Sequence, residues 1–136
     1  MSERTWTAFT RWMKFNLVGA VGIAVQLAAL WLLTSLGLNY ILATAIAVET
    51  AVLHNFFWHE RFTWLDRQDQ GCGSTNRLLR FNLSNGAISI VGNLLCMRLL
   101  VGEARLRPML ANLISIVLCS LVNFLVSDRW VFRSAI

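Results

Sequence analysis

Four long apolar runs set what this chain of 136 residues can fold into. They cover residues 16–38, 39–58, 81–101 and 108–127, and the charges inside them are Glu49 and Arg98. Each run has about 20 residues, the length that an α-helix needs to cross about 30 Å of hydrocarbon. The composition agrees, because 57% of the residues are apolar and 14% are charged, against about 45–50% and about 25% in soluble domains. We therefore predict an all-α membrane protein with four transmembrane helices.

The loops between the runs are unequal and carry most of the positive charge. Runs one and two, and runs three and four, are joined by short connections, whereas a polar loop at residues 59–80 separates the second run from the third. Short connections favour antiparallel neighbours, so we predict two helical hairpins. Nine of the twelve Lys and Arg residues lie in the N-terminal segment, the middle loop and the C-terminal tail. By the positive-inside rule, both termini and the middle loop are then cytoplasmic.

The two hairpins repeat each other at their charged ends. Residues 11–17 read RWMKFNL and residues 77–83 read RLLRFNL, while residues 55–64 and 123–132 share the pattern Asn-Phe-x-x-x-acid-Arg-aromatic-x-aromatic. Because each copy holds two spans, both copies have the same orientation, and we predict parallel repeats rather than inverted ones. In a single domain over 1–136, repeat one then covers about 11–64, a cytoplasmic linker about 65–76, and repeat two about 77–132.

These motifs resemble the GtrA-like family of small four-span membrane proteins, over nearly the whole chain. Residues 14–19 (KFNLVG) are similar to the family's opening, and Asn55-Phe56 and Asn123-Phe124, with the Arg and aromatic residues after them, are similar to its two hairpin ends. The resemblance implies a place in the cytoplasmic (inner) membrane and a role in polysaccharide and cell-envelope glycosylation. It also implies polyprenyl-phosphate-linked sugars as the molecules moved. The related module is also found fused to dolichol-phosphate-mannose-synthase-like transferases.

Six cations in the repeated motifs are candidates for binding a lipid phosphate. They are Arg11, Lys14, Arg61, Arg77, Arg80 and Arg129. If the hairpins pack together, these side chains ring one end of a four-helix bundle, and the forked guanidinium of Arg suits a phosphate. The alternative is that they set the topology and contact anionic lipids.

Residues beside these cations carry two further expectations. His59 is predicted to lie near the surface, where it contacts phosphate. Five aromatic residues are expected to form an interfacial belt: Trp58, Phe62, Trp64, Trp130 and Phe132.

Glu49 lies halfway along the second run, near the predicted centre of the bilayer. A carboxylate at this depth costs several kcal/mol unless it is protonated or partnered, and residues 115–117, the equivalent stretch of repeat two, contain no acid. We therefore predict a functional role, the alternative being a neutral acid bonded to a neighbouring helix. Amide side chains extend this site into a predicted path for a sugar head group, or else they bind the helices together. The path residues are Glu49, Gln26, Asn55, Asn85, Asn93 and Asn123.

The leading functional hypothesis is translocation of a polyprenyl-phosphate-linked sugar across the cytoplasmic membrane. The cations would bind the phosphate, the polar path would carry the head group, and the prenyl tail would stay in lipid. Because two-span repeats enclose little volume, we expect a homodimer or an assembly with a glycosyltransferase. The alternative is a membrane anchor that recruits a glycosyltransferase and moves nothing, with Trp64 and Trp130 on its docking face. Ion or small-solute export has weaker support.

Catalytic and metal-binding motifs are not visible in the sequence. It contains no nucleophile with a base and an orienting group, no P-loop and no metal-ligand spacing. The odd number of cysteines, Cys72, Cys96 and Cys119, argues against a disulfide framework, so we expect free thiols. We therefore predict no enzymatic activity, no cofactor, no metal and no nucleic-acid partner.

Overall fold

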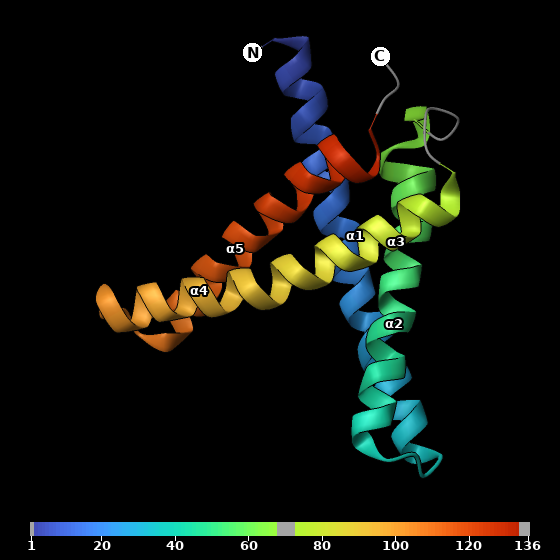
Figure 1. Cartoon of the computed structure of the whole chain (residues 1–136), viewed down its shortest axis with the longest axis vertical. Helices are drawn as coiled ribbons and strands as arrows, with labels where there is room; N and C mark the ends of the chain where they lie inside the picture. The colour runs from blue at the N-terminus through green and yellow to red at the C-terminus, as the bar shows by residue number, and fades with distance from the viewer. Residues whose placement is uncertain (1, 68–72, 134–136) are drawn as a thin grey trace. The chain divides into compact units, whose positions relative to one another are not determined.

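The computed structural model describes residues 2–67 and 73–133, and within these ranges every regular element is a helix (Figure 1). Four helices in this part of the chain are long and apolar enough to cross a membrane: Glu3–Ser35, Ile41–Thr63, Ser74–Glu103 and Leu110–Val131. The predicted all-α fold with four spans is therefore confirmed, and the chain is a multi-pass membrane protein. It forms two compact units, Met1–Asp69 and Gln70–Ile136. Cys72 and part of the predicted linker lie outside the described residues.

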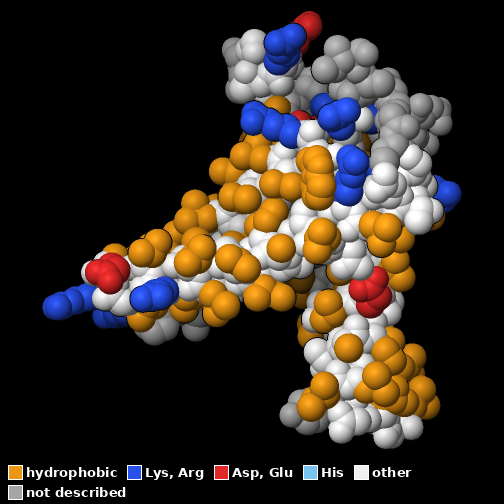
Figure 2. Space-filling model, in the orientation of Figure 1, with side chains coloured by type: hydrophobic (Ala, Val, Ile, Leu, Met, Phe, Trp, Pro, Cys, Tyr) orange, Lys and Arg blue, Asp and Glu red, His pale blue; other side chains and the backbone are white. Residues whose placement is uncertain are grey.

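The outer surfaces of the helices are apolar, as lipid-facing surfaces must be. Large hydrophobic side chains cover much of the visible face of the molecule (Figure 2). Leu27 on the first span is 60% exposed, and Leu94 on the third is 68% exposed. In water such a surface would be an aggregation liability, whereas in a bilayer it contacts acyl chains.

Unit 1 is built on two long helices that pack against each other. α1 (Glu3–Ser35) runs to a short turn, and α2 (Tyr40–Trp58) returns along it (Figure 1). The chain then continues through a π-helical turn, η1 (His59–Thr63), and a 3₁₀ turn, η2 (Leu65–Arg67). α1 begins 13 residues before the apolar run that predicted it, because Ser2 caps its first turn by accepting a hydrogen bond from the Thr5 amide.

The turn between α1 and α2 is closed by hydrogen bonds that the local sequence provides. Gly37 adopts a positive φ of 89°, its amide donates to the Thr34 carbonyl, and the Leu38 amide donates to the Leu33 carbonyl. This is a Schellman motif, in which glycine relieves the steric cost of the left-handed conformation. The Asn39 side chain then accepts from the Ile41 amide at 2.9 Å and so caps α2.

Small residues allow α1 and α2 to approach closely. Ala43, Ala47 and Ala51 occur at every fourth position of α2, and each is at most 4% exposed. On α1, a Cβ added to the buried Gly22 would lie 2.1 Å from Oδ1 of Asn55. Close backbone approach at small residues is the usual way in which helices pack in lipid, where no hydrophobic effect drives them together.

Unit 2 consists of a long composite helix and a second helix that packs against it. The first comprises α3 (Ser74–Ala87), η3 (Ile88–Gly92), α4 (Asn93–Met97) and η4 (Arg98–Glu103). α5 (Pro108–Val126) begins with proline in its first turn and ends in the π-helical turn η5 (Ser127–Val131). α5 contacts η3 and α4, and η5 contacts α3.

Buried residues recur at equivalent positions of the two units. Ala111 and Ser115, which are fully buried, stand 68 residues after Ala43 and Ala47. The rings of Phe15 and Trp64 lie 6.1 Å apart in unit 1, and those of Phe81 and Phe132 lie 6.2 Å apart in unit 2. The amides of Trp64 and Phe132 donate to carbonyls five residues earlier, so both chains turn back at the same place.

Candidate lipid-phosphate site

Two cations are held over aromatic rings in the same way in the two units. In unit 1, Lys14 Nζ lies 4.7 Å from the ring centre of Phe62 and 3.5 Å from the Phe62 carbonyl oxygen. In unit 2, Arg80 lies 5.3 Å from the ring centre of Trp130 and donates to the Trp130 carbonyl at 3.4 Å. Such cation–π contacts contribute about 0.5–2 kcal/mol. Both cations are therefore oriented by neutral groups.

The other four candidate cations have different surroundings. Arg11 donates to Asp66 Oδ2 at 2.6 Å, with the Arg11 side chain 18% exposed and that of Asp66 60% exposed. Its counterpart Arg77 is buried within unit 2, at 6% exposure. Arg61 and Arg129 are exposed, and the guanidinium of Arg61 lies 4.1 Å from the ring centre of Phe57. Three of the six cations belong to each unit, and the ring that would join all six stays a prediction.

Arg11 and Lys14 line one cavity of about 570 Å³ at the end of unit 1, here called the outer cavity. Its lining residues are Trp6, Thr7, Thr10, Arg11, Lys14, Phe62, Thr63, Leu65 and Asp66. Two cations and one carboxylate leave it with net positive charge. The cavity is large enough for a phosphate with part of an attached sugar, since ligand sites span about 300–1,000 Å³. An anion there would meet charge-assisted donors from two side chains of one helix.

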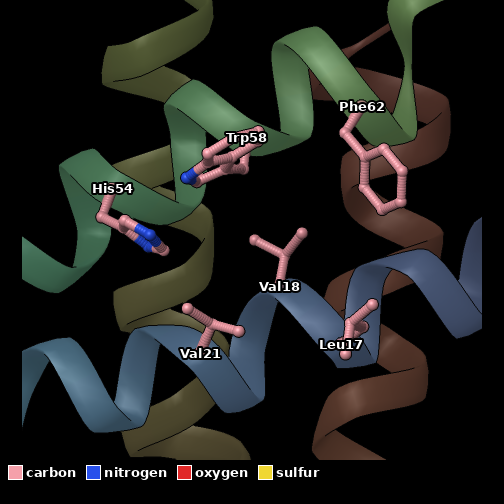
Figure 3. A pocket seen from close by; sticks show the side chains of 6 residues that line it. All are labelled: Leu17, Val18, Val21, His54, Trp58 and Phe62. Carbon is pink, nitrogen blue, oxygen red and sulfur yellow. The ribbon is translucent and has the colours of Figure 1, made fainter.

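A second hollow, here called the apolar groove, lies between α1 and the α2–η1 segment of the same unit (Figure 3). It measures about 290 Å³ and is lined by Leu17, Val18, Val21, His54, Trp58 and Phe62. Phe62 also lines the outer cavity, so the two hollows share this lining residue. The sequence analysis missed this groove, although residues 54, 58 and 62 are spaced by four and thus share one helix face.

The residues of the predicted head-group path have varied surroundings. In unit 1, Glu49 is exposed, Gln26 is half-buried, and the half-buried Asn55 amide lies against Gly22. In unit 2, Asn85 is half-buried and Asn93 is exposed. The burial of these residues does not show a continuous path for a sugar head group, so the path stays a prediction.

One amide of the path clearly binds helices together. The buried Asn123 side chain donates to Ser89 Oγ at 3.3 Å and so ties α5 to η3. Its Oδ1 is buried without a hydrogen-bond partner among the described residues. Asn123 therefore contributes to packing, the role that was the alternative for the amides.

Two expectations about the residues beside the cations are wrong. His59, expected near the surface, is 1% exposed, stacks on Phe15 at 4.7 Å and hydrogen-bonds Thr63 Oγ1 at 3.1 Å. Trp64 and Phe132, expected in the interfacial belt, are at most 2% exposed. The physical reason is the π-helical turn before each, which folds the chain back and packs these rings against the helix ends. Trp64 therefore cannot form the predicted docking face.

The other three residues of the predicted belt are exposed, and their place at a membrane interface stays a prediction. Trp58, Phe62 and Trp130 are 45%, 38% and 42% exposed. Each has an apolar ring at the end of a span, where aromatic side chains favour the boundary between lipid and water. Two of the three, Phe62 and Trp130, are also the rings that hold the cations.

Comparison with known proteins identifies the family. A model of the GtrA/DPMS transmembrane domain matches residues 14–132. The chain belongs to this family. Among curated proteins, the dolichol-phosphate mannosyltransferase of Pyrococcus furiosus is 33% identical over 117 residues, which cover 86% of this chain and 32% of that protein. The predicted resemblance is confirmed, and the GtrA/DPMS chain spans about a third of the length of its curated relative.

The same relative corrects the prediction that this protein is not an enzyme. That prediction is contradicted because the relative is named as a mannosyltransferase, which is an enzyme. This chain corresponds to only about a third of the relative. Absence of a catalytic motif from that third therefore says nothing about enzymatic chemistry in the proteins that carry the domain.

Proposed function

We propose that this GtrA/DPMS protein binds polyprenyl-phosphate-linked sugars and moves them across the cytoplasmic membrane for cell-surface polysaccharide synthesis. The observation that carries the proposal is that Phe62 lines both the outer cavity and the apolar groove in unit 1. A lipid of this class has a phosphate between a polar sugar and a hydrocarbon chain. The outer cavity offers cations for the phosphate, and the apolar groove offers an apolar wall for the hydrocarbon chain. The relative's name, which includes a dolichol phosphate, supports the same class of lipid.

The phosphate would bind first at the cytoplasmic side, where the topology prediction places both termini. Lys14 is suited to this step because its partners are a ring and a carbonyl, and these are neutral. A phosphate can replace the ring as its neighbour without separating an ion pair. Arg80 offers the same arrangement in repeat two. We propose that Arg11, Arg61, Arg77 and Arg129 contribute to the surrounding positive field.

The head group would then cross near Glu49, with its sugar hydroxyls bonded to carboxylate and amide side chains rather than exposed to hydrocarbon. Gln26, Asn55, Asn85 and Asn93 are the amides proposed for this step, while Asn123 also holds α5 against η3. Because each repeat has only two spans, we propose that a homodimer or a glycosyltransferase partner completes the path.

The test is transbilayer movement of a fluorescent polyprenyl-phosphate sugar in liposomes that contain the purified chain. Wild type should move the lipid faster than protein-free liposomes. Glu49→Gln and Lys14→Gln should each abolish the gain, and thermal unfolding of each variant checks that it is folded. Arg105→Gln, which removes a charge from the loop between the third and fourth spans, is the matched control and should transport normally. No movement by folded wild-type protein would refute the proposal.

The anchor hypothesis predicts a different result from the same variants. If the protein only recruits a glycosyltransferase, Glu49→Gln is silent, and substitutions at exposed aromatic residues release the partner. Trp130 remains available for such a contact, at 42% exposure. Wild-type protein that binds a transferase but moves no lipid would favour this alternative.

A further inference from the structure

The apolar groove lies between two helical segments that belong to candidate membrane spans. One segment is α1 and the other is α2–η1. Val18 and Val21 face His54 and Trp58 across it (Figure 3). Phe62 lines the groove and also the outer cavity. The imidazole of His54 is engaged by Asn55, with Nδ1 3.3 Å from Oδ1. The remaining lining side chains are apolar, so the groove suits a hydrocarbon chain.

The cation at the mouth of the groove selects a lipid with a negative head. Lys14 Nζ is 4.7 Å from the ring of Phe62, which lines both hollows. A chain lying in the groove would therefore leave it beside an ammonium group, and beyond it beside Arg11. This order of hydrocarbon, then positive charge, complements a lipid in which the chain is attached directly to phosphate.

The size of the groove favours one chain rather than two. Its volume of about 290 Å³ is at the lower limit of ordinary ligand cavities, about 300 Å³. A phospholipid has two acyl chains on one glycerol, whereas a polyprenyl phosphate has one chain with regularly spaced methyl branches. Flat rings and valine methyl groups offer large contact areas to such a branched chain. The single-chain lipid is therefore the occupant that fits.

The residues that form the wall differ between the repeats. The counterparts of His54 and Trp58, 68 residues later, are Val122 and Val126. In the first span of each repeat the offset is 66, and the counterpart of Val18 is Ser84. The entry motif and the cation over an aromatic ring are shared, but the ring at position 58 is not. The two repeats thus share the cation over a ring and differ in the residues that form the wall of the groove.

We propose that repeat one alone holds the hydrocarbon segment next to the phosphate of a polyprenyl phosphate, in the apolar groove, and that repeat two binds no such chain. This inference rests on the proposed function, whose site it deepens by assigning one lipid to each copy of the protein. The hydrocarbon chain in the groove fixes the position of the lipid along the helices. The phosphate of the lipid therefore lies at Lys14 rather than at Arg80.

The test uses the full chain in nanodiscs with a polyprenyl phosphate that carries a diazirine in its first isoprene unit. After illumination, adducts mapped by mass spectrometry should lie on the groove, at Val18 and Trp58. The equivalent residues Ser84 and Val126 should remain unmodified. Equal modification of the two repeats would overturn the proposal, and so would full displacement of the probe by excess phosphatidylglycerol.

Matched variants separate the groove from general lipid contact. Leu17→Trp narrows the groove, whereas Leu83→Trp makes the same substitution at the equivalent, similarly exposed position of repeat two; the two leucines are 58% and 69% exposed. We expect Leu17→Trp to lower the adduct yield about tenfold, equivalent to about 1.4 kcal/mol of binding free energy. Leu83→Trp should leave it unchanged. Equal yields from the two variants would contradict the inference, and thermal unfolding of both shows that they fold.

Failure of the inference and failure of the proposed function give different results. If wild type moves the sugar lipid and Leu17→Trp moves it equally well, the groove proposal fails and translocation stands. If the probe maps to the groove but wild type moves no lipid, translocation fails and the groove is a site for a lipid that stays on one side.

Discussion

The contact between Gly22 and Asn55 gives a sharp test of how closely α1 and α2 pack. A Cβ at residue 22 would lie 2.1 Å from Oδ1, 2.6 Å from Nδ2 and 2.7 Å from Cγ of Asn55. Gly19, one turn earlier on the same helix, has nothing within 4 Å of an added Cβ. Alanine at the two positions therefore adds the same methyl group to the same helix, once against a neighbour and once in open space.

The difference in stability follows from the geometry. Replacing a helical glycine by alanine contributes about 1 kcal/mol in favour of the helix, and this gain is common to both variants. At residue 22 the amide must also move until Oδ1 is at least 3.4 Å from the new methyl group, and overpacking of this kind costs about 1–3 kcal/mol. Moving the amide also disturbs its contact with His54. We expect Gly22→Ala to be about 1–3 kcal/mol less stable than Gly19→Ala.

The measurement is unfolding of each variant by titration with a denaturing detergent in mixed micelles. Gly19→Ala should match or exceed wild type, and Gly22→Ala should unfold earlier. The double variant Gly22→Ala with Asn55→Ala removes the obstructing amide and should recover part of the loss. If Gly22→Ala and Gly19→Ala unfold together, the helices do not approach as described and the reasoning is refuted.

Three further predictions concern single contacts, each checked by thermal unfolding of the purified variant. Gly37→Ala should lower stability by about 1 kcal/mol, because φ is positive at Gly37. Arg105→Gly should raise stability by up to about 1 kcal/mol, because Arg105 has a φ of 52° and glycine adopts a positive φ without strain. Changes of the same sign in the two variants would contradict this reasoning. Trp64→Ala should lower stability by about 3–5 kcal/mol, because its fully buried ring leaves a cavity, and a loss below 1 kcal/mol would contradict its place in the core. Ser89→Ala should cost about 0.6–2 kcal/mol through the lost bond to Asn123, and unchanged stability would show that this bond does not tie the helices.

The four spans could be predicted because hydrocarbon imposes a length and an absence of charge that a sequence displays directly. The repeated motifs likewise predicted which cations correspond to each other. Lys14 and Arg80 occupy equivalent positions of the motif, and they make matching contacts with Phe62 and Trp130. Residue type and spacing alone identify such pairs. The sequence did not predict which aromatic ring each cation contacts, because that depends on the turns η1 and η5, which contain Phe62 and Trp130.

The errors arose where the backbone leaves α-helical geometry. His59 and Trp64 look like interfacial residues in sequence, but His59 begins the π-helical turn η1 and Trp64 directly follows it. A π-turn needs an extra residue per hydrogen-bonded ring, so side chains beyond it point away from the direction that a 3.6-residue period predicts. The apolar groove could not be predicted because its two walls belong to different helices. The pattern of residues along one helix does not give the distance between two helices.

The helical composition of the two repeats gives them different stiffness. α1 runs as regular α-helix for 33 residues, about 50 Å at 1.5 Å per residue, so a push at its outer end tilts it as one rod. Its counterpart in unit 2 is regular only through Ala87 and then passes into the wider turns of η3 and, after α4, η4. Such turns interrupt the α-helical hydrogen-bond ladder and are common places for a helix to bend. The first span of repeat one is therefore uninterrupted, whereas the first span of repeat two has two places where bending is expected.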